Sequence, residues 1–445
     1  MGNPPWRSKK EDVVHVKWLK ENKKTVGRFE IAQSFLLRTK DFMGNETKSA
    51  LIVTSTIFYN TSTPTRKFKN DFLTSFCVEK FFDLSPVRRL IFEKKNSPAS
   101  IVYYRLSKNN DYQNNLINHQ SVKFNRFIKY FKMLVIEKFD KKDLPQKYFL
   151  ENDWMFKVAL YGASLDFMFL NKINAVPKSK TISSYIDFTN IFGGAGFLKG
   201  NSKEHAPFNF IRGKQIIENA EIDAFYSISN NINNVVTKDE IFVKSGREEN
   251  LYIGKQIFIK EQAKNETEIV VSLSDKSYVF RKGVFSISSK NSNVIEYLFS
   301  ILISEIYQYY IFMISGSWGT STRPQIRWKE EYLSFPIIDT PKEKENVLID
   351  LVNKFLQPIK DYRNSDIKSV VLPFNIHIFS EINEIINQLY SIKDYEKDLI
   401  DYALNVSRYQ FQQSKQKQIT DFNPSDHRNQ KQVLEKYADV YIKEF

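Results

Sequence analysis

The 445-residue sequence contains one cysteine, Cys77, and only five histidines. A single thiol excludes a disulfide framework and a cysteine zinc cluster. The histidines, at positions 15, 119, 205, 377 and 427, show no close ligand spacing. We therefore expect neither a structural zinc site nor metal catalysis.

Uninterrupted hydrophobic runs are also scarce. No apolar segment follows the early charges, so the N-terminus lacks a signal-peptide pattern. The longest apolar stretch, residues 294–314, contains Glu296, Glu305 and Gln308, and a charge near the middle of a membrane span is costly. This pattern predicts a buried amphipathic helix, no membrane partner and a cytoplasmic protein.

Positive charge is abundant. Lys and Arg number 65 against 51 Asp and Glu, which gives a net charge of +14. Apolar residues make up 42% and charged residues 26%, a composition typical of a globular chain with a sizeable core. The excess of positive charge favours a polyanionic partner, usually nucleic acid, although a basic solvated surface without a function fits the same numbers.

Short apolar runs and helical periods alternate over the first hundred residues. Residues 50–54, 78–84 and 100–104 have the composition of buried strands, and residues 29–36 and 72–76 follow a helical period. Strand, helix and strand in this order predict an α/β sheet.

The character of the chain changes three times after that. Asn-rich stretches separate helical patterns over residues 106–184, so we expect a connecting helical segment there. Short β-like runs return in residues 185–340, where Gly and Asn punctuate them as in a compact mixed domain. Residues 341–445 are largely helical, with an i, i+3, i+4, i+7 stripe that begins at Ile382.

The most informative motif is Asn3-Pro4-Pro5-Trp6. It fits a proline-restricted tail, and it also fits a catalytic loop that acts on an adenine amine. The Asn side-chain oxygen and the carbonyl of the next Pro each accept one N–H, which turns the nitrogen lone pair towards an incoming methyl group. The prolines fix φ and so hold these acceptors in place, while the aromatic ring offers a face for an extruded base.

The following residues strengthen the second interpretation. Phe29-Glu30-Ile31-Ala32-Gln33-Ser34-Phe35, the strand at 50–53 and Leu90-Ile91-Phe92 before residues 97–104 appear in the order found in one family. The chain resembles the catalytic domain of the adenine-N6 DNA methyltransferases of type I and type IIG restriction–modification systems. The resemblance implies that Asn3, Pro4, Pro5 and Trp6 are catalytic, and that Trp6 and Phe92 stack on a flipped adenine. Phe92 also fits an ordinary core position.

The same resemblance implies the domain organisation. Residues 1–105 would form the C-terminal half of a Rossmann-like methyltransferase sheet, of class α/β. A helical linker over 106–184 would join it to a mixed α+β target-recognition domain at 185–340, and a helical region would follow at 341–445.

Two similar segments mark the recognition domain. Phe210-Ile211-Arg212-Gly213-Lys214 is echoed by Tyr252-Ile253-Gly254-Lys255, as in type IIG enzymes. Gly beside Lys or Arg suits phosphate contact, because bare backbone approaches the strand while the cation neutralises it; solvated surface turns give the same pattern. The DNA contacts implied by the resemblance are Arg212, Lys214, Lys255, Trp318 and Arg323.

The resemblance also raises the question of the cofactor. The family's main order places the S-adenosylmethionine site before the Asn-Pro-Pro loop, and this sequence starts at the loop. We therefore expect that site to lie largely outside this chain, in a partner chain or an N-terminal segment. A permuted order would instead use Gly193, Gly194 and Gly196, but Pro207 follows soon after and no helix opens behind them, so we expect a loop that enters the recognition domain there.

The sequence therefore predicts a component of a site-specific DNA adenine methyltransferase, in a restriction–modification or phage-defence system, that acts on double-stranded DNA. A split subunit, a misplaced start and a truncated remnant all fit its length. The alternative is a specificity module that binds DNA without chemistry, which would have no need of the Asn3 loop.

Overall fold

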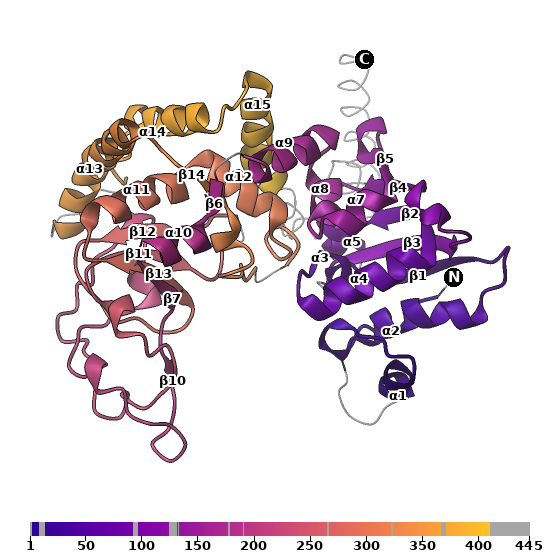
Figure 1. Cartoon of the computed structure of the whole chain (residues 1–445), viewed down its shortest axis with the longest axis horizontal. Coiled ribbons are helices and arrows are strands. Elements are labelled where there is room, and N and C mark those ends of the chain that lie inside the picture. Colours follow the sequence, from indigo (N-terminus) through magenta and orange to yellow (C-terminus); the bar gives the residue numbers. More distant parts are fainter. Residues whose placement is uncertain are drawn as a thin grey trace, which may run out of the picture. The chain divides into compact units, whose positions relative to one another are not determined.

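The computed structural model describes residues 2–8, 14–91, 97–123, 131, 133–176, 179–189, 191–264, 267–321, 324–365 and 371–409. The chain forms two compact units. The first unit comprises Met1–Ala163, Gly319–Thr322 and Val406–Phe445, and the second comprises Ser164–Trp318 and Arg323–Asn405. Each has its own five-stranded sheet (Figure 1).

The sheet of the first unit has the strand order β1-β3-β2-β4-β5. β3 is antiparallel to both of its neighbours, β2 and β4 are parallel, and β5 is antiparallel to β4. The strands are β1 (Lys48–Thr54), β2 (Phe76–Asp83), β3 (Ala99–Leu106), β4 (Leu116–Ser121) and β5 (Lys141–Pro145).

Helices cover this sheet and supply an aromatic core. Phe68 and Phe72 lie one turn apart on α4, so both project from the same side of the helix, and their stacked rings pack against Phe58. The helices are α1 (Val14–Glu21), α2 (Ile31–Arg38), α3 (Thr56–Tyr59), α4 (Thr63–Ser75), α5 (Arg88–Ile91), α7 (Gln146–Glu151) and α8 (Met155–Tyr161).

The α/β class and the three predicted strands of the first unit are confirmed, but the segment 106–184 differs from the helical linker that the sequence predicts. It contributes β4 and β5 to the first sheet, and the boundary between the units lies at 163/164. Two amide side chains of this segment satisfy buried backbone groups of the first unit. Asn115 donates to the carbonyl of Val78 at 2.7 Å, and Gln146 donates to those of Leu73 and Phe76 at 2.6 and 2.7 Å.

His119 on β4 is fully buried, stacked on Phe81, and neither ring nitrogen has a hydrogen-bond partner among the described residues. Burial lowers its pKa well below the usual 6.5, and the charge of Lys142 lowers it further. The unfolded chain therefore binds a proton that the folded chain does not. The free energy of unfolding is retained above about pH 6.5 and falls below that pH, by about 1.4 kcal/mol at one pH unit lower.

We expect His119→Leu to remove this part of the acid sensitivity. Urea unfolding at about pH 7.5 and 5.5 checks it, and an unchanged pH dependence would contradict the assignment.

The sheet of the second unit has the order β7-β13-β11-β12-β9. All its pairs are antiparallel except β12 with β9. The strands are β7 (Phe192–Ala195), β9 (Phe225–Tyr226), β11 (Lys255–Lys260), β12 (Val271–Ser274) and β13 (Val284–Ser289); two further pairs are β8 (Leu198–Lys199) with β10 (Val243–Ser245) and β6 (Ser179–Thr181) with β14 (Pro336–Ile338).

The helices of the second unit include the long apolar stretch. The single helix predicted for it is two helices, because Ser304 ends α11 and its side chain caps α12 at Tyr307. The two helix axes differ by 62° at this break. No single described helix is long and apolar enough to cross a membrane, and among the described helices only α11 and α12 taken together have the length and composition of a span. The helices are α9 (Ser164–Asn174), α10 (Ile182–Phe188), α11 (Ser292–Ile303), α12 (Glu305–Ile314), α13 (Lys342–Asn364), α14 (Ile376–Leu389) and α15 (Asp394–Tyr402).

Candidate active site at the N-terminal loop

Gly2 adds a parallel partner to the edge strand β1. Its N–H donates to the carbonyl of Ala50 and its carbonyl accepts from the N–H of Ile52, both at 2.9 Å, in a parallel bridge with Leu51. Parallel chains leave a sheet at the same edge. The residues after Gly2 therefore emerge where β1 itself ends, at Thr54.

The motif Asn3-Pro4-Pro5-Trp6 follows Gly2 directly and lies at this edge of the sheet. Pro4 is buried and Trp6 is half-buried, whereas Asn3 and Pro5 are exposed. The indole N–H of Trp6 donates to the carbonyl of Ile52 at 3.3 Å, which ties the end of the motif back to β1. The motif is therefore anchored at Gly2 and at Trp6, and Asn3 lies on the surface between these anchors.

A cavity of about 300 Å³ opens beside the motif. Its volume is at the lower end of the range for small-molecule sites, roughly 300–1,000 Å³. The hydroxyls of Thr54 and Thr56, at the end of β1, are 2.8 Å apart. The wall is mostly polar and combines the loop, the start of α2 and the end of β1. It is lined by Trp6, Arg7, Ser8, Glu30, Ala32, Thr54, Thr56 and Ser97.

The start of α2 is shaped by an unusual backbone. Arg28 and Phe29 both have left-handed conformations, with φ of 51° and 52°, so the helix predicted from residue 29 begins at Ile31. Two bulky residues in this region cost of the order of 1–3 kcal/mol each, and such strain often accompanies function. The N–H of Ile31 donates to the carbonyl of Arg7 at 3.1 Å, which joins this turn to the loop. The resulting backbone path brings Glu30 to the cavity.

Glu30 is the acidic group of the cavity wall. Burial raises the pKa of its carboxyl, against the opposing effects of the hydrogen bond from Gln33 and the charge of Arg28. Gln33 in turn accepts from the N–H of Gly27 at 2.7 Å. The Phe-Glu motif of the sequence therefore contributes a partly buried carboxyl to the site.

A buried polar network supports the same edge of the sheet, and sequence reasoning missed it. Asp83, at the end of β2, accepts hydrogen bonds from the hydroxyl of Tyr59 and, at 2.8 Å, from the N–H of Ser85. Ser85 donates to Ser55 at 2.9 Å, and Ser55 lies 2.5 Å from Ser100 between their hydroxyl oxygens. Burial raises the pKa of Asp83, although its hydrogen bonds lower it. An Asp that ends an apolar strand before Leu-Ser-Pro is the available sequence signal. The network fixes the two segments that leave β1 and β2.

The remaining predicted residues differ in where the structure places them. Phe92 and Arg323 lie outside the described residues. Arg212 is exposed beside Gly213, whose φ is 71°. Lys214 is half-buried, and its ammonium lies 3.1 Å from the ring centroid of Phe210.

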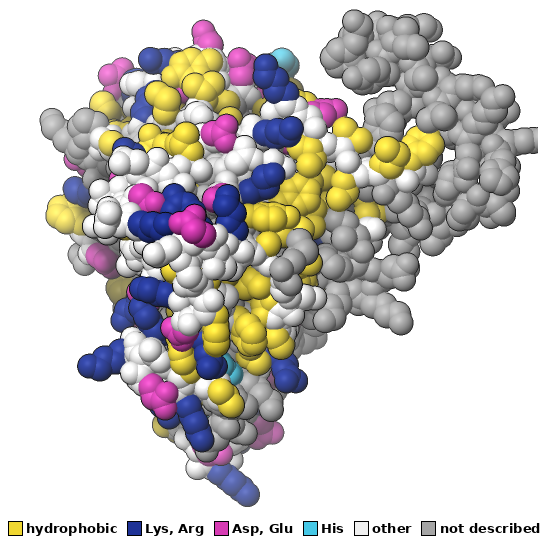
Figure 2. Space-filling view, turned by 90° about the vertical axis from the view of Figure 1, so that its right-hand side faces the viewer, with side chains coloured by type: hydrophobic (Ala, Val, Ile, Leu, Met, Phe, Trp, Pro, Cys, Tyr) yellow, Lys and Arg dark blue, Asp and Glu magenta, His cyan; other side chains and the backbone are white. Residues whose placement is uncertain are grey.

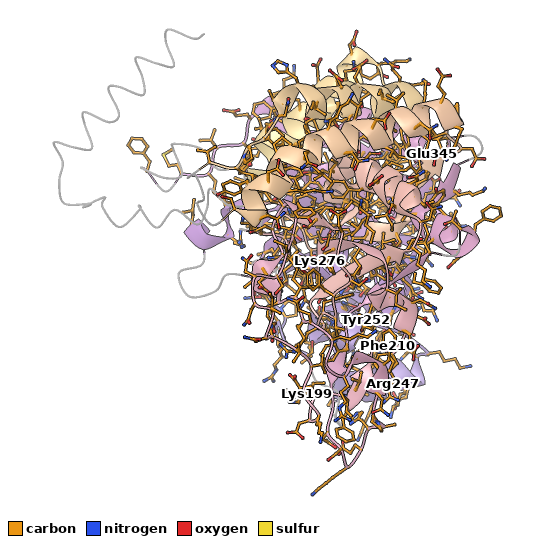
Figure 3. All side chains as sticks on the ribbon, turned by 90° about the vertical axis from the view of Figure 1, so that its left-hand side faces the viewer. Lys199, Phe210, Arg247, Tyr252, Lys276 and Glu345 are labelled. Carbon is orange, nitrogen blue, oxygen red and sulfur yellow. The ribbon has the colours of Figure 1, made fainter. Side chains whose placement is uncertain are left out.

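That ring is partly buried against a hydrophobic core cluster of the second unit. Phe210 packs against the buried cluster that contains Phe208 and Tyr252 (Figure 3). Arg212 and Lys214 are thus presented by a turn that is fixed to a core, which suits them to contact a rigid partner.

Lys255 and Trp318 are placed differently from the prediction. Trp318 is fully buried, with its ring edge-on to Phe312 at 5.3 Å between centroids. The side chain of Lys255 is 11% exposed, and its ammonium lies 2.9 Å from Asp275 and 2.5 Å from Glu296. A buried ring and an amine held between two carboxylates do not reach a ligand, so we assign both side chains to the internal structure of the second unit.

The glycine cluster does not form a cofactor turn. Gly193 and Gly194 lie in β7 and pair with Ile287 and Ser286 of β13. A Cβ at Gly196 would lie 2.5 Å from the carbonyl oxygens of Phe280 and Arg281, so close backbone packing requires glycine there. The expectation of a loop at this place is corrected to an edge strand, and its geometry does not fit the permuted alternative.

Known proteins resemble this chain in two ways. In structure, it is similar to the type IIL restriction-modification enzyme MmeI in complex with DNA, with a TM-score of 0.52 and 10% identity over 93% of this chain and 57% of that one. The type IIG restriction endonuclease BpuSI matches with a TM-score of 0.31 and 12% identity, over 93% and 54%. No curated protein sequence matches. The likeness to MmeI shows the fold alone, and the chain spans little more than half of that enzyme's length. In sequence, residues 1–92 match the Eco57I restriction-modification methylase family, so the predicted resemblance to restriction–modification methyltransferases is confirmed.

Proposed function

We propose that this chain is a component of a site-specific DNA methyltransferase that methylates the exocyclic N6 amine of adenine in a restriction–modification or phage-defence system. One observation carries the proposal: the parallel bridge of Gly2 with β1 brings Asn3-Pro4-Pro5-Trp6 to the end of that strand, beside a polar cavity. The match of residues 1–92 to a methylase family supports the reaction class.

The chemistry follows from the residue types of the loop. An adenine amine is a poor nucleophile, because its lone pair is delocalised into the ring. The Asn3 carboxamide oxygen and the Pro4 carbonyl accept its two N–H groups and direct the lone pair out of the ring plane. Acceptors that are fixed before the reaction lower its barrier without reorganisation, and the prolines and the Trp6 hydrogen bond fix this loop.

A base inside a duplex does not reach such a loop, so the target adenine must leave the stack. In the proposal the Trp6 ring covers one face of the extruded base, and Phe92 covers the other. The cavity beside Trp6, with Thr54 and Thr56 on its wall, would receive the base edge.

S-adenosylmethionine would supply the methyl group from its sulfonium. The described residues of the first unit offer no Gly-rich turn between a strand and a helix, so we assign none of them to this cofactor. We propose that a partner chain or another segment holds it, close to the edge of the sheet that carries Asn3.

The second unit would bind the target DNA sequence. It presents Arg212 and Lys214 from a turn that is fixed to a buried core, and the net charge of +14 suits a polyanion. MmeI, whose fold is similar, is described in complex with DNA. Residues 185–340 are the proposed recognition domain, with Arg323 as a further contact.

The product of the reaction tests the proposed chemistry. We expect the complete methyltransferase, incubated with S-adenosylmethionine and mixed-sequence duplex DNA, to produce N6-methyladenine and no methylated cytosine. Digestion to nucleosides followed by mass spectrometry measures both products. Methylated cytosine alone would overturn the assignment to adenine.

A further inference from the structure

The face shown in Figure 2 has no single patch of positive charge. On the face shown in Figure 2, Lys and Arg side chains are interspersed with acidic and apolar ones. The net charge of +14 therefore does not identify a DNA-binding surface. A candidate surface is found instead from the Lys and Arg side chains that are not paired with acidic ones.

A shallow depression of about 440 Å³ in the first unit has three basic residues among the six that line it. Arg66 is paired with Asp153, and Asp71, the one acid of the wall, is paired with Lys24 at 3.2 Å. Lys23 and Lys67 are exposed and make no ion pair within the described part of the chain. The depression is lined by Lys23, Thr25, Arg66, Lys67, Asn70 and Asp71.

Its donors suit phosphate oxygens. Protein contacts to the nucleic-acid backbone come from Lys, Arg, Thr and Asn side chains, and all four residue types line this depression. Lys23 has a left-handed backbone with φ of 51°, in the turn that follows α1. The wall thus joins that turn to the middle of α4.

The depression is close to the candidate active site along the chain. Thr25 lines the depression and Glu30 lines the cavity. Five residues span at most about 18 Å, even when fully extended. The connection is also tightly packed, since a Cβ on Gly27 would lie 2.2 Å from the Thr65 hydroxyl oxygen of α4. At about 3.4 Å per base step, this reach corresponds to roughly five nucleotides of a duplex strand.

We propose that the depression between Lys23 and Lys67 binds backbone phosphates of the DNA strand that flanks the target base. The inference rests on the proposed function and extends it, because it gives the first unit a contact to the DNA backbone, separate from the contacts of Arg212 and Lys214 in the second unit. Contacts of this kind neutralise phosphates without reading bases, so they add the same affinity for every sequence.

The test compares two charge-matched double variants of the full chain. Lys23→Gln/Lys67→Gln removes the two unpaired cations. Lys48→Gln/Lys108→Gln removes two lysines at the opposite end of the sheet from Thr54, since Lys48 begins β1 and Lys108 follows β3. Binding to two unrelated duplexes of equal length is measured by fluorescence anisotropy between about 50 and 200 mM salt.

The salt dependence decides the outcome. Each lost phosphate contact lowers the slope of log affinity against log salt by about 0.9, so the Lys23/Lys67 variant should lose close to two units of slope on both duplexes. The control variant should keep the wild-type slope. Equal slopes for the two variants would overturn the inference while leaving DNA binding intact. A wild-type chain that binds no DNA at low salt would overturn the recognition function as well.

Discussion

The substitution Asn3→Ala is expected to reduce methyl transfer by the complete enzyme by at least about 100-fold, with DNA affinity unchanged. Removal of one preorganised acceptor or donor at a reacting group commonly costs about 10²–10³ in kcat. Asn3 is exposed at the edge of the sheet, between the backbone pairing of Gly2 and the Trp6 hydrogen bond, so its side chain is not needed for packing. The loss should therefore appear in turnover and not in stability.

Three measurements separate this result from a general defect. Methylation rate, duplex affinity and thermal stability are compared for wild type, Asn3→Ala and Asn114→Ala, which removes an exposed carboxamide from a turn of the same unit. Only Asn3→Ala should lose turnover, and kcat and kcat/KM should fall together, as for an interaction made in the transition state. Unchanged turnover would remove Asn3 from the catalytic loop and favour the non-catalytic DNA-binding alternative.

The strands that frame this loop were predictable from the sequence. Residues 50–54, 78–84 and 100–104 are short apolar runs bounded by polar segments, and they coincide with β1, β2 and β3 within a few residues. Their apolar composition predicts covered faces; β2 is largely buried, whereas the edge strand β1 is half-buried over most of its length. The position of the loop at the end of β1 was not predicted, because it depends on the parallel bridge of Gly2 with Leu51, which no local pattern reveals.

The strand β4 was not predictable in the same way. Its sequence, Leu-Ile-Asn-His-Gln-Ser, has few apolar residues and lies next to Asn-rich turns. It is a strand because β2 and β5 pair with both of its edges, and because His119 stacks on Phe81. Tertiary pairing of this kind overrides local propensity.

The individual DNA contacts were the least predictable feature. A basic residue beside a glycine has the same sequence signature whether its ammonium faces solvent or a buried carboxylate. Arg212 and Lys255 follow the same pattern in the sequence, yet one is exposed and the other lies between Asp275 and Glu296. Glu296 is 41 residues away on α11, so no local pattern around Lys255 reveals the pair.

That buried pair leads to the second large effect: Lys255→Met is expected to destabilise the second unit by about 3–5 kcal/mol, without lowering the DNA affinity of the folded chain. Burial alone would lower the pKa of Lys255, but its hydrogen bonds to Glu296 and Asp275 outweigh burial and raise it. Among the described residues, loss of the amine leaves Glu296, whose side chain is 7% exposed, with only the amide of Asn353 at 3.2 Å. An uncompensated buried carboxylate is the main cost.

A paired variant makes this prediction specific. If the cost lies in the uncompensated charge, Lys255→Met/Glu296→Leu should recover much of the stability lost in Lys255→Met, because replacing both members of a buried ion pair by apolar residues is often nearly neutral. Urea unfolding gives the free energies, and anisotropy at low urea gives the DNA affinity of each folded variant. Full stability of Lys255→Met together with weakened DNA binding would instead return Lys255 to the DNA surface. Lost stability with unchanged DNA binding would establish that the lysines of the two similar segments have different roles. Lys214 would then serve the surface of the second unit, and Lys255 would join β11 to α11 through its ion pair.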